Sequence, residues 1–134
     1  MILYRDDKWQ VVDKPEGMAT HAASPGELGA VEWIELHLGI KTHVVSRLDR
    51  GTSGVLLLAR HPEASSRAQA IHESDEALKI YEFISPEMSE QEKWICEDPI
   101  DGKEASTRFT RLGAAETGCA PGPARIFRYS ARIS

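Results

Sequence analysis

The densest group of polar residues that could do chemistry is Ser46-Arg47-Leu48-Asp49-Arg50-Gly51-Thr52-Ser53-Gly54. It precedes the apolar run 54–59, which is suited to a buried strand, and active-site residues often occupy loops that such strands hold in place. Asp49 lies between two arginines, whose charges favour an ionised carboxylate that can act as a nucleophile or a base. The arginines could also bind phosphate groups, and an Asp-Arg turn can equally be a solvated ion pair.

Other site patterns do not fit this loop. Residues 51–54 lack the GxSxG spacing of a hydrolase elbow, and the Walker sequence GxxxxGK[ST] is missing. A glycosidase would need a second carboxylate beside Asp49, and the candidates Glu73 and Glu82 have nothing to distinguish them. A hydrolase that uses the Asp49 carboxylate in another way stays open as an alternative.

The composition predicts one folded domain, residues 1–134. Hydrophobic residues make up 41% of the chain and charged residues 28%, as in globular proteins. No apolar run approaches the roughly 20 residues that cross a bilayer, and the N-terminus MILYRDDKWQ contains acids, so we expect a cytoplasmic protein without a membrane partner. Cys96 and Cys119 form no CxxC pair, which favours reduced thiols, and the five histidines show no ligand spacing. We expect no metal and no cofactor.

The net charge of −5 argues at first against a polyanionic partner, but the charges are unevenly distributed. Residues 82–104 carry −6, whereas residues 105–134 carry +4 and residues 41–60 carry +3. Basic residues therefore gather around Asp49, the single carboxylate of the 41–60 segment.

The elements that must position Asp49 follow from periodicity and turn residues. We expect a hairpin of strands 1–5 and 9–13, a helix over 28–38 ended by Gly39, and a second helix from Pro62. Further strands are expected at 43–46, 54–59, 78–84, 105–112 and 124–134. The stretch after Pro86 shows poor periodicity, and residues 113–123 are predicted to be a connector. This order of elements indicates a mixed α/β sheet.

The last segment alternates clearly. Phe127, Tyr129, Ala131 and Ile133 share one face, and Arg128, Ser130 and Arg132 share the other, as in a half-buried strand. Because the chain stops within this strand, we expect an edge that lacks a partner.

Several segments together resemble RluA-type RNA pseudouridine synthases. Residues 47–60, RLDRGTSGVLLLAR, are similar to the RLDxxTSG signature of that family. Lys14-Pro15-Glu16-Gly17, with His21 four residues on, resembles the KPxG loop, Lys79-Ile80-Tyr81 resembles the KxY strand, and residues 102–107 resemble the GKxAxT segment. The resemblance covers nearly the whole chain.

The resemblance implies an α+β fold with a mixed, mainly antiparallel sheet flanked by helices. It implies that Asp49 attacks the target uridine, that Tyr81 lines the uracil pocket, and that Arg47 enters the RNA stack where the uridine flips out. The remaining RNA-binding residues would be Arg50, Thr52, Ser53, Lys14, His21 and Lys79. The partner would be ribosomal or transfer RNA, with no cofactor, and a monomer is expected if the domain is complete.

Two departures from the family pattern bear on activity. Ser46 stands where most relatives carry histidine, and the later TGRxHQIR segment, whose arginine pairs with the catalytic aspartate, is absent. We therefore expect a catalytic domain truncated at its C-terminus. The alternative to an active synthase is an inactive RNA-binding fragment of the same fold.

Overall fold

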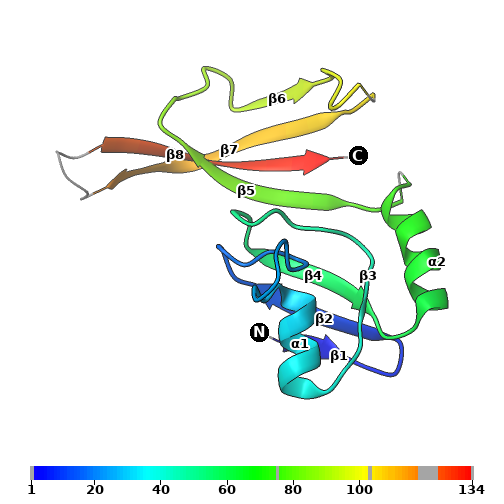
Figure 1. Cartoon of the computed structure of the whole chain (residues 1–134). Helices are drawn as coiled ribbons and strands as arrows, with labels where there is room; N and C mark the ends of the chain where they lie inside the picture. Colours follow the sequence, from blue (N-terminus) through cyan, green and yellow to red (C-terminus); the bar gives the residue numbers. More distant parts are fainter. Residues whose placement is uncertain (1, 75, 103, 118–123, 134) are drawn as a thin grey trace. The chain divides into compact units, whose positions relative to one another are not determined.

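The computed structural model describes residues 2–74, 76–102, 104–117 and 124–133 (Figure 1). Two helices and eight strands occur among these residues. The chain forms two compact units, Met1–Ser74 and Asp75–Ser134. Each unit has its own antiparallel sheet.

The sheet of the first unit holds the strands that flank Asp49. It contains β1 (Ile2–Arg5), β2 (Trp9–Lys14), β3 (His43–Val44) and β4 (Gly54–Ala59), in the order β1-β2-β4-β3, with every pair antiparallel. The Asp6 carboxylate closes the β1-β2 turn by accepting hydrogen bonds from the backbone N–H groups of Lys8 and Trp9, at 2.8 and 2.7 Å. The predicted hairpin is confirmed.

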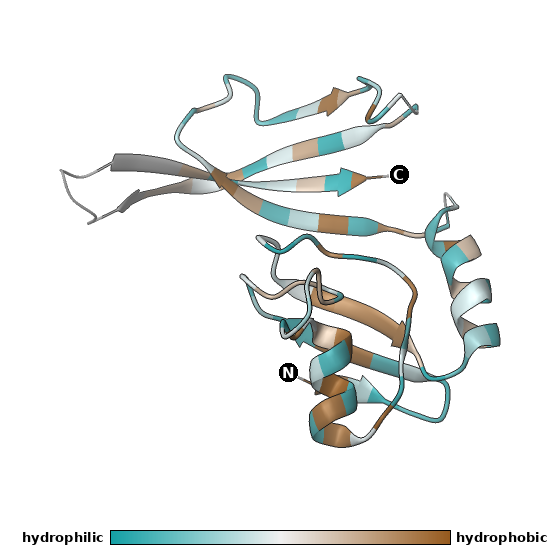
Figure 2. Ribbon diagram, in the orientation of Figure 1, coloured by the Kyte–Doolittle hydropathy of each residue, from teal (hydrophilic) through white to brown (hydrophobic). Residues whose placement is uncertain are grey.

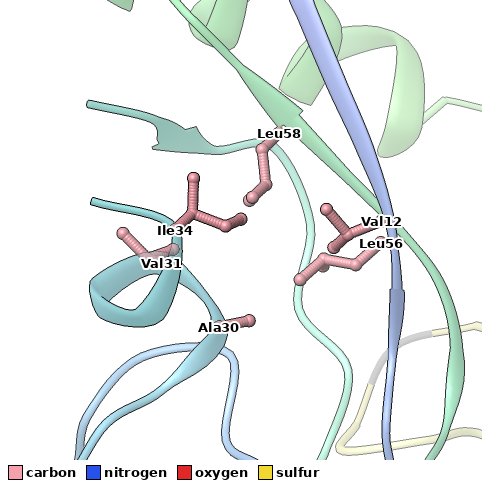
Figure 3. Packing of buried hydrophobic residues seen from close by; sticks show 6 residues of the cluster. All are labelled: Val12, Ala30, Val31, Ile34, Leu56 and Leu58. Atoms are coloured by element: carbon pink, nitrogen blue, oxygen red, sulfur yellow. The ribbon is translucent and has the colours of Figure 1, made fainter. Parts of the chain in front are cut away.

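The two helices pack on opposite faces of β4. Helix α1 (Ala30–Leu38) packs on the face that carries Leu56 and Leu58, and α2 (Pro62–His72) packs on the face that carries Leu57 and Ala59. The first core consists of Val12, Ala30, Val31, Ile34, Leu56 and Leu58 (Figure 3). Strand β4 is mostly apolar (Figure 2), and coverage of both faces explains this for residues 56–59, whereas Val55 is 69% exposed.

The first predicted helix is confirmed with a small shift. It begins at Ala30 rather than at residue 28, because Gly29 has an extended backbone and is the N-cap. Gly39 ends it with a left-handed φ of 65°, as predicted.

The second unit is a sheet of four antiparallel strands. It contains β5 (Lys79–Ser85), β6 (Lys93–Cys96), β7 (Thr107–Thr117) and β8 (Ala124–Ile133), in the order β5-β8-β7-β6. Aromatic rings on one face form its core. The Phe83 ring stacks on Tyr129 at 5.3 Å and Trp94 stacks on Phe109 at 4.9 Å, between ring centroids.

The predicted α+β class with antiparallel pairing and flanking helices is confirmed, although the strands form two sheets rather than one. Three details of the prediction were wrong. Strand β6 lies in the stretch that seemed aperiodic, and residues 113–117 belong to β7 rather than to a connector. The final strand is also not an edge, because β8 pairs with both β5 and β7.

The alternation predicted for the final strand is confirmed. Phe127, Tyr129 and Ala131 are buried, while Arg128 and Arg132 are exposed. The single-domain assignment of residues 1–134 stays a prediction. Cys119 and the rest of the 118–123 connector lie outside the described residues.

Two kinds of feature are absent from the described residues. Within the described part of the chain, neither helix has the length and apolar character of a membrane span. The same residues contain no cluster of three or more His, Cys, Asp or Glu side chains suited to a metal ion.

Candidate active site: the Asp49 loop

The residues predicted to do chemistry lie in an exposed loop between β3 and β4. We call residues 47–53 the Asp49 loop. Asp49, Arg47 and Ser53 are exposed, and Thr52 is half-buried. A tight turn follows Asp49, since the backbone N–H of Thr52 donates to the Asp49 carbonyl at 3.0 Å. The carboxylate of Asp49 is therefore accessible to a large substrate.

Gly54 joins this loop to the buried strand β4. Its φ of 122° lies in a region that residues with a Cβ rarely adopt. Glycine at this position lets the chain turn from the exposed loop directly into the register of β4, where Gly54 pairs with Lys14. The backbone conformation thus explains why the TSG motif ends in glycine.

A second loop, residues 15–29, holds the Asp49 loop from both sides, and we call it the support loop. The Thr20 hydroxyl donates to the Leu48 carbonyl at 2.8 Å and accepts the Leu48 N–H at 3.0 Å. On the other side of Asp49, the Gly17 N–H donates to the Arg50 carbonyl at 2.8 Å. Both residues beside Asp49, Leu48 and Arg50, are therefore hydrogen-bonded to the support loop.

Arg50 also attaches the Asp49 loop to the support loop. Its guanidinium donates to the Gly17 carbonyl at 3.3 Å and forms an ion pair with Glu27. The hydrogen bond from Arg50 holds the pKa of the Glu27 carboxyl below its usual value. Arg50 was predicted to contact RNA, but in this structure its side chain joins the two loops.

Lys14 was predicted to bind RNA, and the structure argues against a direct contact. The residue is 0% exposed, and its ammonium donates to the carbonyls of Met18 at 2.7 Å and Pro15 at 3.2 Å. Burial lowers the pKa of Lys14, the negative charge of Asp49 raises it, and the positive charge of Arg50 lowers it. Lys14 is thus a buried cation that shapes the support loop beneath Asp49.

His21 is exposed and has a partner in α1. Its Nδ1 lies 2.6 Å from the Glu32 carboxylate, whose other oxygen accepts the N–H groups of Ala22 and Gly29. Burial raises the pKa of Glu32, but the hydrogen bonds from His21 and the backbone lower it more, so the net shift is downward. His21 thereby takes part in the attachment of the support loop to the helix.

Tyr81 and Lys79 lie on β5, in the second unit. Tyr81 is half-buried and stands opposite Ala131 of β8, on the face that carries the aromatic core. The predicted KxY strand is therefore present. That Tyr81 and Asp49 act in one site stays a prediction, since the two residues belong to different units.

The sequence interpretation missed the residues that fix the Asp49 loop. Thr20, Glu27 and Glu32 were not singled out, although Glu32 lies three residues after Gly29, a spacing at which a Glu side chain can accept the N-cap N–H, as it does here at 3.1 Å. That spacing could have identified Glu32. Nothing in the sequence pairs Thr20 with Leu48, because the two are 28 residues apart.

A family model matches most of the chain. The model described as RNA pseudouridylate synthase matches residues 8–121, which include the support loop, the Asp49 loop and the Tyr81 strand. The chain belongs to the RNA pseudouridylate synthase family, and the motifs place it with the RluA type.

Curated relatives carry related names. An uncharacterised RNA pseudouridine synthase of Zymomonas mobilis is 31% identical over 102 residues, covering 74% of this chain and 47% of that protein. The ribosomal large subunit pseudouridine synthase C of Vibrio parahaemolyticus is 32% identical over 127 residues, covering 84% of this chain and 40% of that protein. The chain thus spans less than half the length of these relatives.

Solved structures show the same fold. Human RNA pseudouridylate synthase domain containing 1 aligns with a TM-score of 0.77 at 16% identity, and domain containing 4 aligns with 0.71 at 18%. Each alignment covers 98% of this chain and 58% of the human chain. The predicted pseudouridine synthase fold is confirmed.

Proposed function

We propose that this chain carries the catalytic aspartate of an enzyme that isomerises uridine to pseudouridine in ribosomal or transfer RNA. The observation that carries the proposal is the exposed Asp49, whose two neighbouring residues are hydrogen-bonded to the support loop. An aspartate presented in this way on a rigid scaffold is suited to attack a nucleoside. The choice of this reaction rests on the family to which the chain belongs.

In the proposed reaction the Asp49 carboxylate attacks the ribose C1′, and the bond from C1′ to N1 of uracil breaks. The base turns and its C5 bonds to C1′, which breaks the bond between C1′ and Asp49 and frees the carboxylate. The C5 proton then leaves, and N1 gains a proton. No cofactor or external energy is needed, since substrate and product are isomers. Tyr81 would line the uracil pocket and assist proton transfer.

Arg47 is the proposed contact to the RNA stack. It is exposed, and the described residues show no hydrogen bond or ion pair of its guanidinium. A guanidinium can stack in the position of a flipped-out base, which offsets the cost of unstacking. Among the other residues predicted to bind RNA, Thr52 and Ser53 lie in the Asp49 loop, and Ser53 is exposed.

Release of tritium tests the reaction directly. Unmodified ribosomal and transfer RNA transcripts are labelled with tritium at uridine C5, and we expect the protein to release the label into water. We expect Asp49→Ala to reduce release at least about a thousandfold, because the nucleophile is gone. Asp13→Asn is the matched control, since Asp13 is an exposed carboxylate on the neighbouring strand β2.

RNA binding separates the alternatives. Binding that weakens steeply with salt indicates phosphate contacts, whereas a hydrolase acting on a small substrate would show none. If the wild-type chain binds RNA in this manner but releases no tritium, the inactive RNA-binding fragment is favoured instead. Arg47→Ala should weaken binding while leaving stability within about 0.5 kcal/mol, because the residue is exposed.

Cytoplasmic location and a monomeric state are part of the proposal. Size-exclusion chromatography with light scattering, carried out with and without RNA, tests the monomeric state of the chain. Localisation of a tagged protein in cells tests the location.

A further inference from the structure

Thr20 is a buried side chain whose single oxygen binds both polar groups of one distant residue. It is 3% exposed, and its hydroxyl donates to the Leu48 carbonyl while accepting the Leu48 N–H. Leu48 directly precedes Asp49. A threonine hydroxyl has one donor and two acceptor sites, so this arrangement uses the donor and one acceptor for a single neighbour.

The backbone of Thr20 is fixed in turn to α1. The Thr20 carbonyl accepts the Val31 N–H at 3.2 Å, and the Ala19 carbonyl accepts the Ala30 N–H at 2.9 Å. These N–H groups belong to the first turn of the helix. They have no hydrogen-bond acceptor within the helix itself. Ala30 and Val31 are also members of the buried core. A continuous path therefore runs from the core through Thr20 to the residue beside Asp49.

We propose that Thr20 is a positioning residue for Asp49. This inference rests on the proposed function. The Asp49 side chain is exposed, and among the described residues its carboxylate makes no hydrogen bond or ion pair, so its direction depends on the backbone on either side. Gly17 binds the carbonyl of Arg50, the residue after Asp49, and Thr20 binds both backbone groups of Leu48, the residue before it. Loss of one attachment leaves the loop able to rotate about the other.

The shape of Thr20 permits a test that removes only the hydrogen bonds. Valine has nearly the same shape as threonine but no hydroxyl, so Thr20→Val leaves the N–H and carbonyl of Leu48 without their partner. Serine keeps the hydroxyl, so Thr20→Ser should restore the contacts. Ser65→Ala is the matched control, because Ser65 is also buried and donates to a carbonyl, that of Val44, from α2.

Amide hydrogen exchange measures the position of the loop without requiring activity. In Thr20→Val we expect exchange of the Leu48 amide to accelerate at least about fivefold, as loss of one hydrogen bond implies. The amides of Leu56 and Leu58 in β4 report global unfolding and should change less than Leu48. Ser65→Ala should leave the ratio of Leu48 to Leu56 exchange unchanged.

Tritium release from C5-labelled RNA measures the catalytic consequence. We expect Thr20→Val to lower kcat about 10- to 100-fold with KM within about twofold, because a small misplacement of a reacting group affects the transition state more than binding. Thr20→Ser should recover kcat to within about threefold of wild type.

The outcomes separate this inference from the proposed function. Equal acceleration at Leu48, Leu56 and Leu58, or wild-type kcat in Thr20→Val, would overturn the positioning role. If the wild-type chain releases no tritium, the proposed function fails for this chain. The exchange data then still decide whether Thr20 fixes the Asp49 loop.

Discussion

Lys14 is a cation with no access to water. Its ammonium binds two backbone carbonyls and lies near the charges of Asp49 and Arg50. Burial lowers its pKa from 10.5, so the folded protein releases the proton at a lower pH than the unfolded chain. Between the folded pKa and 10.5 the unfolded chain binds more protons, and stability therefore rises with pH across that window.

We expect the free energy of unfolding of the wild type, measured in urea from pH 7 to 10.5, to increase relative to that of Lys14→Met as the pH approaches 10.5. The methionine variant has a similar length and no titratable group, so it provides the baseline. A difference between the two proteins that stays constant with pH would mean that Lys14 keeps its ordinary pKa.

Gln10 is a second buried polar side chain, and it differs from Lys14 in its contacts. It is 0% exposed, and neither its amide oxygen nor its nitrogen has a hydrogen-bond partner among the described residues. A buried polar group without a partner costs about 1 to 3 kcal/mol. We expect Gln10→Met to raise the free energy of unfolding by about that amount, measured by urea unfolding.

Gln69 provides the contrast for this prediction. Its amide is exposed and donates to the Val44 carbonyl at 2.8 Å, so Gln69→Met should lower stability by about 0.5 to 1.5 kcal/mol. If the Gln10→Met protein were less stable than wild type, the Gln10 amide would have hydrogen-bond partners, such as bound water. Their stabilisation would exceed the cost of burying the amide.

At the scale of elements, the start of α1 is packed against the support loop without space for a side chain. A Cβ at Gly29 would lie 2.6 Å from the Glu32 carboxylate, 2.6 Å from the His21 carbonyl carbon and 2.7 Å from the Ala22 nitrogen. The φ of −82° at Gly29 suits any residue, so the restriction is steric. We expect Gly29→Ala to destabilise the fold by about 1 to 3 kcal/mol in urea unfolding.

Gly51 is the matched glycine for this test. A Cβ there would meet nothing within 4 Å, and no positive φ is found at this position. Gly51→Ala should therefore be neutral or stabilise the protein by up to about 1 kcal/mol. Equal losses in the two variants would show that helix start and support loop are not closely packed.

The elements that could be predicted from the sequence are those with local signals. The Gly39 helix end, Pro62 at a helix start and the alternation of residues 127–133 depend on neighbours in the sequence, and all were predicted. Strand β6 was missed because it is only four residues long, Lys93–Cys96, and lies within a long acidic segment without alternation. The central place of β8 was missed because strand order depends on pairing between distant segments.

The same distinction applies to the candidate site. Residue types and spacing identified the Asp49 loop, since a carboxylate between arginines before a buried strand is a local pattern. The attachments of that loop could not be predicted, because Thr20, Glu27 and Gly17 contact residues 23 to 33 positions away. For the same reason Lys14 was interpreted as a phosphate contact, although the fold buries it.

At the scale of the whole molecule, the two units contain different kinds of core. In Met1–Ser74, aliphatic side chains of one sheet pack between two helices, and every hydrogen-bonded strand partner of this sheet lies within the unit. In Asp75–Ser134, aromatic rings cover one face of a sheet. The Asp49 loop, its support loop and the helix that holds them belong entirely to the first unit.

This distribution predicts that residues 1–74 fold without the rest of the chain. A domain of this size can be marginally stable alone, and here the sheet, both helices and the core are local to the fragment. We expect the fragment to show cooperative thermal unfolding by circular dichroism and protection of the Leu56 and Leu58 amides. Leu56→Ala, which should cost about 2 to 5 kcal/mol, is the control that abolishes the transition. An isolated fragment without cooperative unfolding or protected amides would show that the Asp49 loop depends on residues 75–134 for its fold.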